Sequence, residues 1–194
     1  MTAIFDTFIR KYSSEHPLSD EARAELFSHL SLLSFEKKHV LIRENQHHDY
    51  AYFIIEGAVR SYYLKDGVEV NTWFAFENDM VGSLQNFRNL PSRETFELIE
   101  NTTFVAINLR TLRPLIHTNI EIANVVLLII EEYAQFLEDR IFSSQFNNSL
   151  ERYEALLKYD QLVLQRVPLT YIASYLGIKP PSLSRIRKRI LSKK

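Results

Sequence analysis

The chain has 194 residues, which is enough for one large domain or two small ones. It contains no cysteine, and this excludes disulfide bonds, thiolate zinc sites and cysteine-held iron–sulfur clusters. The sequence shows neither an apolar run long enough to span a membrane nor a secretory leader. We therefore expect a cytoplasmic protein that makes no contact with a membrane.

The net charge is −1 at neutral pH, but it is distributed unevenly along the chain. No acidic residue follows Asp160, and the last 34 residues contain eight basic ones: Arg166, Lys179, Arg185, Arg187, Lys188, Arg189, Lys193 and Lys194. The first 160 residues carry all 24 acidic side chains and the other 15 basic ones. This asymmetry favours an acidic body with a basic module that binds an anion such as nucleic acid. A solvated basic tail is the alternative.

Residues 1–34 have the apolar spacing of helices. Ile4, Phe5, Phe8 and Ile9 fall on one side of the first. The second follows in LSDEARAELFSHL, where Ser19 is placed to cap the helix N-terminus.

Residues 35 to about 109 consist of short runs rich in Tyr, Phe, Val and Ile, separated by polar turns. Glu56-Gly57 and Asp66-Gly67 lie between such runs, about ten residues apart, and each predicts a hairpin. Short strands at this spacing are typical of a small antiparallel barrel or jelly roll. With the flanking helices, the fold class is α+β.

A second helical region begins near Leu112 to Pro114, and residues 120–146 are predicted to form one long helix. Its apolar stripe is broader than one face needs, so we expect it both to cover the roll and to pair with a second copy. The expected dimer interface is Val126, Ile129, Tyr133, Phe136, Leu137 and Arg140. A polar joint at Asn147-Asn148 precedes another amphipathic helix.

The segment YIASYLGIKPPSLSRIRKRI places two prolines within a helical pattern. Thr170 is placed to cap a first helix, and Gly177 can adopt the left-handed conformation that ends it. Pro180 and Pro181 then fall in the first turn of a second helix, where backbone N–H groups have no helical partner to lose. With Ala173 as a small residue at the crossing, the spacing predicts a helix-turn-helix.

On the second helix, Leu183, Ile186 and Ile190 share one side and must face inward. Arginine in the first half of such a helix suits guanine, and the remaining cations suit phosphates. The predicted DNA-binding residues are Thr170, Lys179, Pro181, Ser182, Ser184, Arg185, Arg187, Lys188 and Arg189.

The layout resembles the Crp/Fnr family of bacterial transcription regulators, chiefly through YAYFIIEGAVRSYYLKDGVEV and IASYLGIKPPSLSRIRK. The resemblance implies a cyclic-nucleotide-binding-like roll over residues 1–118, a dimerisation helix over 119–146 and a helix-turn-helix domain over 147–194. It also implies a homodimer that binds a pseudo-palindromic operator in double-stranded DNA, with RNA polymerase as a further partner, and it implies no enzymatic activity.

The sensory half departs from that family. Members that bind cyclic AMP hold its phosphate with a short helix after Gly-Glu and with an Arg-Ser pair. The corresponding places here are Gly82-Ser83 and Ser92-Arg93, the acidic residue for the ribose is missing, and the arginine is displaced by one position. Arg93 is either an anion ligand or a solvated loop residue beside Glu94. We expect an effector other than cyclic AMP, or none, and no cofactor.

Two further functions are open from the sequence. A roll of this kind also occurs in cupin metal enzymes, for which His47, His48 and Glu56 are the only cluster to test. Adjacent residues of a strand point to opposite faces, so the two histidines can share a metal only from a loop, and we expect no metal site. The other alternative is a ligand sensor that acts on a protein partner.

Overall fold

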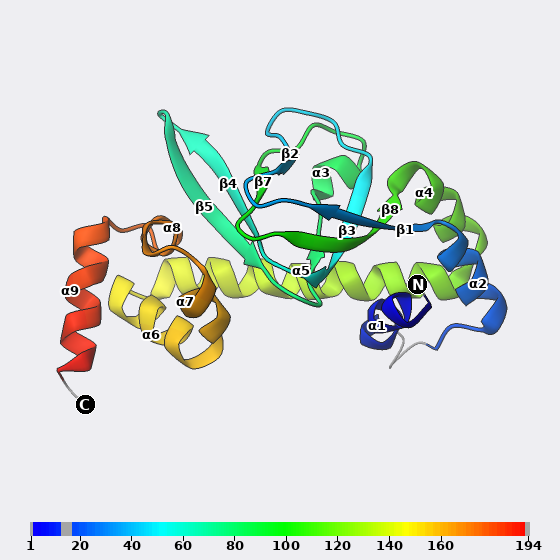
Figure 1. Ribbon diagram of the computed structural model, residues 1–194. Coiled ribbons are helices and arrows are strands. Elements are labelled where there is room, and N and C mark those ends of the chain that lie inside the picture. The colour runs from blue at the N-terminus through cyan, green and yellow to red at the C-terminus, as the bar shows by residue number, and fades with distance from the viewer. Residues whose placement is uncertain (1, 13–16, 193–194) are drawn as a thin grey trace. The chain divides into compact units, whose positions relative to one another are not determined.

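The computed structural model describes residues 2–12 and 17–192 and combines helices with antiparallel strands (Figure 1). The chain begins with helices α1 (Thr2–Tyr12) and α2 (Asp20–Ser28). The strands are β1 (Leu30–Phe35), β2 (Val40–Ile42), β3 (Tyr50–Glu56), β4 (Val59–Lys65), β5 (Val68–Ala75), β6 (Met80–Val81), β7 (Thr95–Leu98) and β8 (Thr102–Asn108). Helix α3 (Leu84–Phe87) lies between β6 and β7.

The remaining elements are all helical: α4 (Leu109–Thr118), α5 (Ile120–Phe146), α6 (Ser149–Tyr159), α7 (Gln161–Arg166), α8 (Leu169–Tyr175) and α9 (Pro180–Leu191). The predicted α+β class, with a roll, one long helix over 120–146 and a C-terminal helix pair, is confirmed. The predicted basic residues Lys193 and Lys194, and the side chain of Ile4, lie outside the described part of the chain.

The strands form two four-stranded sheets, in the orders β1-β8-β3-β6 and β2-β7-β4-β5. Strand β8 pairs antiparallel with β1, where Leu30 lies opposite Ile107, and with β3, where Tyr50 lies opposite Asn108. The prediction that residues 30–34 are helical is wrong. Helix α2 ends at Ser28, and Leu30–Phe35 pair along the edge of the first sheet, because this pairing outweighs their local helical spacing.

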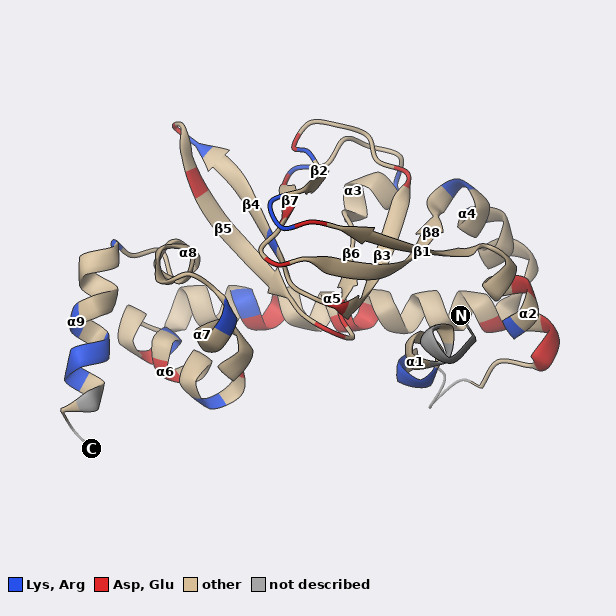
Figure 2. Cartoon of the chain, viewed as in Figure 1, with Lys and Arg blue, Asp and Glu red and all other residues tan. Residues whose placement is uncertain are grey.

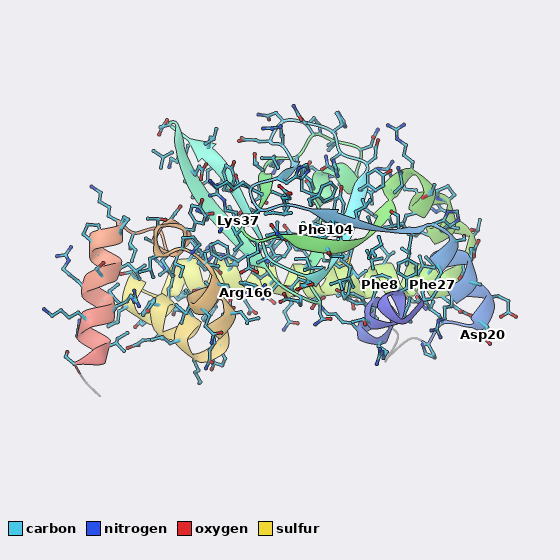
Figure 3. The ribbon with its side chains drawn as sticks, viewed as in Figure 1. Phe8, Asp20, Phe27, Lys37, Phe104 and Arg166 are labelled. Carbon is cyan, nitrogen blue, oxygen red and sulfur yellow. The ribbon has the colours of Figure 1, made fainter. Side chains whose placement is uncertain are left out.

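The larger core lies among α1, α2, the first sheet and the beginning of α5. Phe8 contacts Phe53 of β3 edge to face, with ring centroids 5.2 Å apart. Tyr12 donates a hydrogen bond to Glu132 of α5 (3.0 Å), and its burial together with this carboxylate raises the pKa of the phenol. Ser19 caps α2 as predicted, because its hydroxyl accepts a hydrogen bond from the N–H of Ala22. Phe104, labelled in Figure 3, is fully buried on β8.

The two predicted hairpins have different outcomes. Asp66 and Gly67 join the neighbouring strands β4 and β5, and both have positive φ (53° and 77°), as a tight two-residue turn requires. Glu56-Gly57 makes no hairpin, because β3 and β4 belong to different sheets. Gly57 has φ of 110°, and a Cβ there would lie 2.5 Å from the carbonyl oxygen of Asn101, so the corner needs glycine.

Two helical boundaries differ from the prediction. Helix α4 begins at Leu109 and carries Pro114 in its interior, whereas the sequence placed Pro114 near its start. The amphipathic segment after Asn147-Asn148 is two helices, α6 and α7, which meet at Asp160. Helix α6 begins with a capping box, in which the side chain of Asn148 and that of Glu151 each accept a hydrogen bond from the other's backbone N–H.

The chain divides into two compact units: Met1–Val59 with Ala75–Gln135, and Arg60–Phe74 with Phe136–Lys194. The hairpin of β4 and β5 thus belongs to the same unit as the C-terminal helices. The domain limits at residues 118 and 146 stay predictions. Of the helices described, none combines the length and apolar character that crossing a bilayer requires.

Candidate nucleic-acid interface

The break between α8 and α9 is a helix C-cap built around Gly177. Its φ is 67°, its N–H donates to the carbonyl of Ser174 (3.0 Å), and the N–H of Ile178 donates to the carbonyl of Ala173 (2.9 Å). These two hydrogen bonds form a Schellman motif, which satisfies carbonyls that the helix end leaves open. The predicted end of the first helix at Gly177 is therefore confirmed.

The two prolines open α9, as the sequence predicts. Lys179 is the N-cap, Pro180 and Pro181 occupy the first two helical positions, and the N–H of Leu183 donates to the carbonyl of Lys179 (3.2 Å). Proline is tolerated here because these positions have no intrahelical N–H partner. The break between the helices is therefore part of the motif.

The prediction that Thr170 caps α8 is wrong. The helix starts two residues earlier, at Leu169, its N-cap is Pro168, and no side chain makes a capping hydrogen bond. Proline fixes the extended conformation that precedes a helix, so it supplies the geometry of the cap without a side-chain oxygen. Thr170 is exposed in the first turn, where its hydroxyl stays a candidate phosphate donor.

The two helices share a small aliphatic core. Ile172, Ala173 and Leu176 of α8 and Leu183 of α9 are buried, and Ile178, Ile186 and Ile190 are partly buried. Arg152 of α6 donates to the carbonyl of Leu176 (2.9 Å). The C-terminal end of α8 is therefore tied both to α9 and to α6.

The opposite side of α9 faces outward and is basic. Pro181, Ser184, Arg185, Lys188 and Arg189 are exposed, while Ser182 and Arg187 are partly buried. Figure 2 shows Lys and Arg along this helix and no acidic residue on it.

Two hydrogen bonds shape the beginning of this surface. The hydroxyl of Ser184 donates to the carbonyl of Pro180 (3.2 Å), and Arg185 donates to the hydroxyl of Ser182 (3.3 Å). The Ser184 oxygen keeps lone pairs that can accept a hydrogen bond from a base amino group. The helix therefore presents a guanidinium and a hydroxyl near its N-terminal half.

The arrangement was compared with known proteins. Residues 32–119 match the family model described as a cyclic nucleotide-binding domain. FixK2 from Bradyrhizobium japonicum superposes with a TM-score of 0.73 at 20% identity, over 84% of this chain and 85% of that one. A protein assigned to the Crp/Fnr family from Eubacterium rectale gives 0.72 at 16% identity, over 91% and 85%. The catabolite activator protein of Thermus thermophilus gives 0.56 at 15% identity, over 92% and 86%. No curated protein sequence matches significantly.

The chain has the Crp/Fnr fold. The resemblance seen in the sequence is thus confirmed at the level of architecture, from the roll through the long helix to the C-terminal helices. Identities of 15 to 20% show the fold alone.

The residues predicted for an effector pocket lie on two segments, before α3 and before β7. Gly82 and Ser83 precede α3, whose N-cap Ser83 makes no side-chain capping hydrogen bond. Arg93 is exposed on the loop before β7. Its neighbour Ser92 is buried, and the Ser92 hydroxyl donates to the carbonyl of Glu94 (2.7 Å). The serine is thus engaged within its own loop.

His47, His48 and Glu56, the residues considered as metal ligands, lie in different surroundings. His48 lies 2.7 Å from the hydroxyl of Tyr52, and burial lowers the pKa of its imidazole, opposed by Asp49. His47 and Glu56 are exposed. Across residues 2–12 and 17–192, no three His, Asp or Glu side chains gather as a metal site would require.

The six residues predicted for a dimer interface mostly face their own chain. Val126 and Ile129 pack against the core, and Tyr133 is partly buried, which raises the pKa of its phenol. Phe136 contacts the ring of Trp73 (6.1 Å between centroids), and the Arg140 guanidinium lies 4.0 Å from the centre of the Tyr175 ring. Only Leu137 among them is exposed.

A second apolar stripe on α5, which the sequence analysis did not separate from the first, is more open. It runs through Leu127, Ile130, Ala134, Leu137 and Ile141 at alternating steps of three and four. Leu127 is 53% exposed and Ile141 is 57% exposed. This spacing is the seam pattern of paired helices, and it is visible in the sequence once the inward stripe is known.

Proposed function

We propose that the chain is a sequence-specific DNA-binding transcription regulator that acts as a homodimer on a pseudo-palindromic site. The observation that carries the proposal is the exposed, acid-free basic side of α9, which follows a glycine turn and a buried α8–α9 contact. A helix held in this way by a preceding helix is the element that enters the major groove in helix-turn-helix proteins.

The residues of this surface divide by role. Arg185 is the candidate for a bidentate contact with guanine, and Ser184 for a hydrogen bond to a base edge. Lys188, Arg189, Arg187 and Lys179 are placed to neutralise phosphates, together with hydroxyls of Ser182 and Thr170. Pro181 donates no N–H and supplies an apolar contact. A DNA target implies a cytoplasmic location and RNA polymerase as the partner that reads the outcome.

The test is a paired charge reversal, Arg185→Glu with Lys188→Glu, followed by fluorescence anisotropy on a duplex selected from random sequences by the wild-type protein. We expect affinity to fall by about 100-fold or more, because each good base contact contributes about 1–3 kcal/mol. The slope of log affinity against log salt should also decrease by about one for each lost phosphate contact.

The matched control is Lys37→Glu with Arg43→Glu, which makes the same charge change at exposed positions of the roll. We expect the control to bind within a few-fold of wild type. If the α9 variant binds as well as this control, α9 does not read DNA, and regulation of a protein partner becomes the better hypothesis.

We further propose that the dimer forms along the open stripe of α5. Leu127 and Leu137 are its test positions, because both are exposed and neither contributes to the buried core. Replacing either by lysine should convert a dimer to a monomer in sedimentation equilibrium, while Leu64→Lys, at the exposed hairpin tip, should not. A wild-type chain that sediments as a monomer would contradict the proposal.

We also propose that any effector differs from cyclic AMP. This rests on Ser92, whose buried hydroxyl is bonded within its own loop, and on the exposed position of Arg93. Titration calorimetry with cyclic AMP should give no heat of binding, and Arg93→Ala should leave DNA affinity unchanged in its presence or absence. Saturable binding that Arg93→Ala abolishes would restore cyclic AMP as the effector.

A further inference from the structure

A buried arginine connects the hairpin of β4 and β5 to α8, the first helix of the proposed helix-turn-helix. Arg60 on β4 is only 2% exposed. Its guanidinium lies between two aromatic rings, 4.2 Å from the centre of Tyr62 on β4 and 4.0 Å from that of Tyr171 on α8. It also donates to the carboxylate of Glu69 on β5. A buried charge needs such partners, so this geometry is specified by several groups at once.

A second contact, one helical turn further along α8, uses the open edge of the hairpin. The Ser174 hydroxyl donates to the carbonyl of Glu69 (2.9 Å) and accepts from the N–H of Asn71 (3.0 Å). Strand β5 is the last strand of its sheet in the described chain, so these backbone groups lie on its outer edge. The serine thus takes the place of a neighbouring strand for one residue pair.

A third contact continues the same side of α8. The ring of Tyr175 lies 5.2 Å from that of Phe74 on β5 and 4.0 Å from the guanidinium of Arg140 on α5. Tyr171, Ser174 and Tyr175 are spaced three and four residues apart, so they share one face of α8. The opposite face, with Ile172, Ala173 and Leu176, is buried with α9.

This division of α8 connects the hairpin to α9. One face of the helix contacts the hairpin, the helix also contacts α9, and the Gly177 turn forms the connection between the two helices. The basic side of α9 stays uncovered in this arrangement. The contacts of Arg60 and Ser174 with α8 therefore lie one helix away from α9, on the path that connects it to the hairpin.

We propose that Arg60 and Ser174 are positioning residues for DNA reading, which hold α8 on the β4–β5 hairpin and so fix the direction in which α9 meets the major groove. The inference rests on the proposed function. Each base pair added between two half-sites rotates the second half-site about the DNA axis by roughly one tenth of a turn. A dimer whose two recognition helices are held rigidly should therefore bind DNA tightly at only one half-site spacing. Removing the contacts of Arg60 or Ser174 with α8 should make DNA affinity less dependent on half-site spacing, while the cations of α9 proposed to bind phosphate remain.

The experiment measures affinity for the selected operator and for duplexes with one or two base pairs added or removed between its half-sites. For wild type we expect a loss of at least about tenfold at a changed spacing. For Arg60→Met and Ser174→Ala we expect weaker binding to the best spacing, about tenfold, and a spacing penalty below about threefold. Affinity for an unrelated duplex should stay within about twofold.

Conservative variants separate positioning from folding. Tyr171→Phe keeps the ring over Arg60 and Ser174→Thr keeps the hydroxyl, so both should retain the wild-type spacing profile, whereas Tyr171→Leu should not. Arg110→Met, at an exposed arginine, controls for the lost charge. Amide hydrogen exchange without DNA should show faster exchange over α8 in Arg60→Met and Ser174→Ala. If Arg60→Met does not fold, the half-buried Ser174 and Tyr171 still carry the test.

The outcomes distinguish the two proposals. Folded variants that keep the steep spacing profile, or wild-type exchange over α8, overturn the positioning role while leaving DNA binding intact. A wild-type protein that selects no duplex overturns the proposed function, and the DNA-reading part of the inference with it.

Discussion

The roll and the C-terminal helices use their large side chains differently. In the roll, Phe8, Phe53 and Phe104 are buried and contact other rings. From residue 136 onward the buried residues are mostly aliphatic, and Phe142 and Phe146 of α5 and Tyr159 of α6 are 60 to 75% exposed. Large aromatic side chains are therefore buried in the roll, whereas several are exposed from the end of α5 onward.

The cations of the β4–β5 hairpin also differ from those of α9 in their burial. Arg60 is buried between two rings and neutralised by Glu69, and it holds structure in place. Arg185, Lys188 and Arg189 are exposed and have no acidic residue on their helix. Arginine is thus an internal anchor in the hairpin, whereas on α9 it is free of acidic neighbours on its own helix and open to solvent.

The largest expected effect follows from emptying the roll core. Phe104→Ala should lower the free energy of unfolding by about 3–5 kcal/mol, because it removes a fully buried ring and leaves a cavity. Urea unfolding measures this loss. The matched control, Phe142→Ala at a 60% exposed ring, should lie within about 0.5 kcal/mol of wild type. Equal losses would mean that the two regions do not differ as described.

The corner glycine of the roll should be less replaceable than the hairpin glycine. In Gly57→Ala the new methyl group would meet the Asn101 carbonyl at 2.5 Å, in addition to the strain of a positive φ, and about 3 kcal/mol or more should be lost. In Gly67→Ala there is nothing within 4 Å, so only the left-handed strain remains, about 1–2 kcal/mol. Thermal unfolding should rank the two variants in this order.

A smaller change probes the aliphatic core of the helix pair. Ile172→Val removes one methylene group at a position with no exposed surface and should cost about 0.5–1.5 kcal/mol. Hydrogen exchange should be faster over α8 and α9 and unchanged over β3 and β8. An increase spread evenly over all four elements would contradict a separate core for the C-terminal helices.

The smallest effect is a pH dependence within the roll. Burial lowers the pKa of His48 in the folded protein, so the unfolded chain takes up the proton first as pH falls. The stability that the neutral imidazole contributes is present above its ordinary pKa of about 6.5 and is lost as pH falls toward the folded value. Melting temperatures between pH 7.5 and pH 5.5 should fall more in wild type than in His48→Gln.

The exposed neighbour His47 provides the control for that measurement. His47→Gln should melt with the same pH dependence as wild type, because it changes only an exposed side chain and leaves His48 and its contact with Tyr52 in place. If His48→Gln also follows the wild-type curve, the contact with Tyr52 does not depend on the charge of the imidazole.

The sequence was most informative where local chemistry decides the structure. Gly177, Pro180 and Ser19 each have a conformational or hydrogen-bonding requirement that acts within a few residues, and the turn and the two helix starts at these positions follow it. The limits of the long helix at 120 and 146 were also predictable, since no proline or glycine interrupts the run.

Errors arose where distant parts of the chain decide the outcome. Glu56-Gly57 and Asp66-Gly67 present the same local signal, but only the sheet assignment of β3 and β4 distinguishes a corner from a hairpin. Leu30–Phe35 is a strand because β8, more than sixty residues later, pairs with it. The two stripes of α5 could not be assigned to inside and outside until the packing of Val126 and Ile129 was known.

Arg60 illustrates the limit for the candidate site. An arginine within the apolar run AVRSYY suggests an unusual environment, but its partner Tyr171 lies 111 residues further along the chain. No local pattern predicts such a pairing. The outward cations of α9 were predictable because a single helix determines which of its residues face out.

The hydrogen bonds of Ser174 to strand β5 have a consequence for the fate of damaged chains. An unpaired outer strand is a template on which another molecule's strand can add, and that is a route to aggregation. Here one turn of a helix occupies part of that template. Proteolysis between α6 and α8 would release this cover, and the outer edge of β5 would then be open to pairing with a strand of another chain.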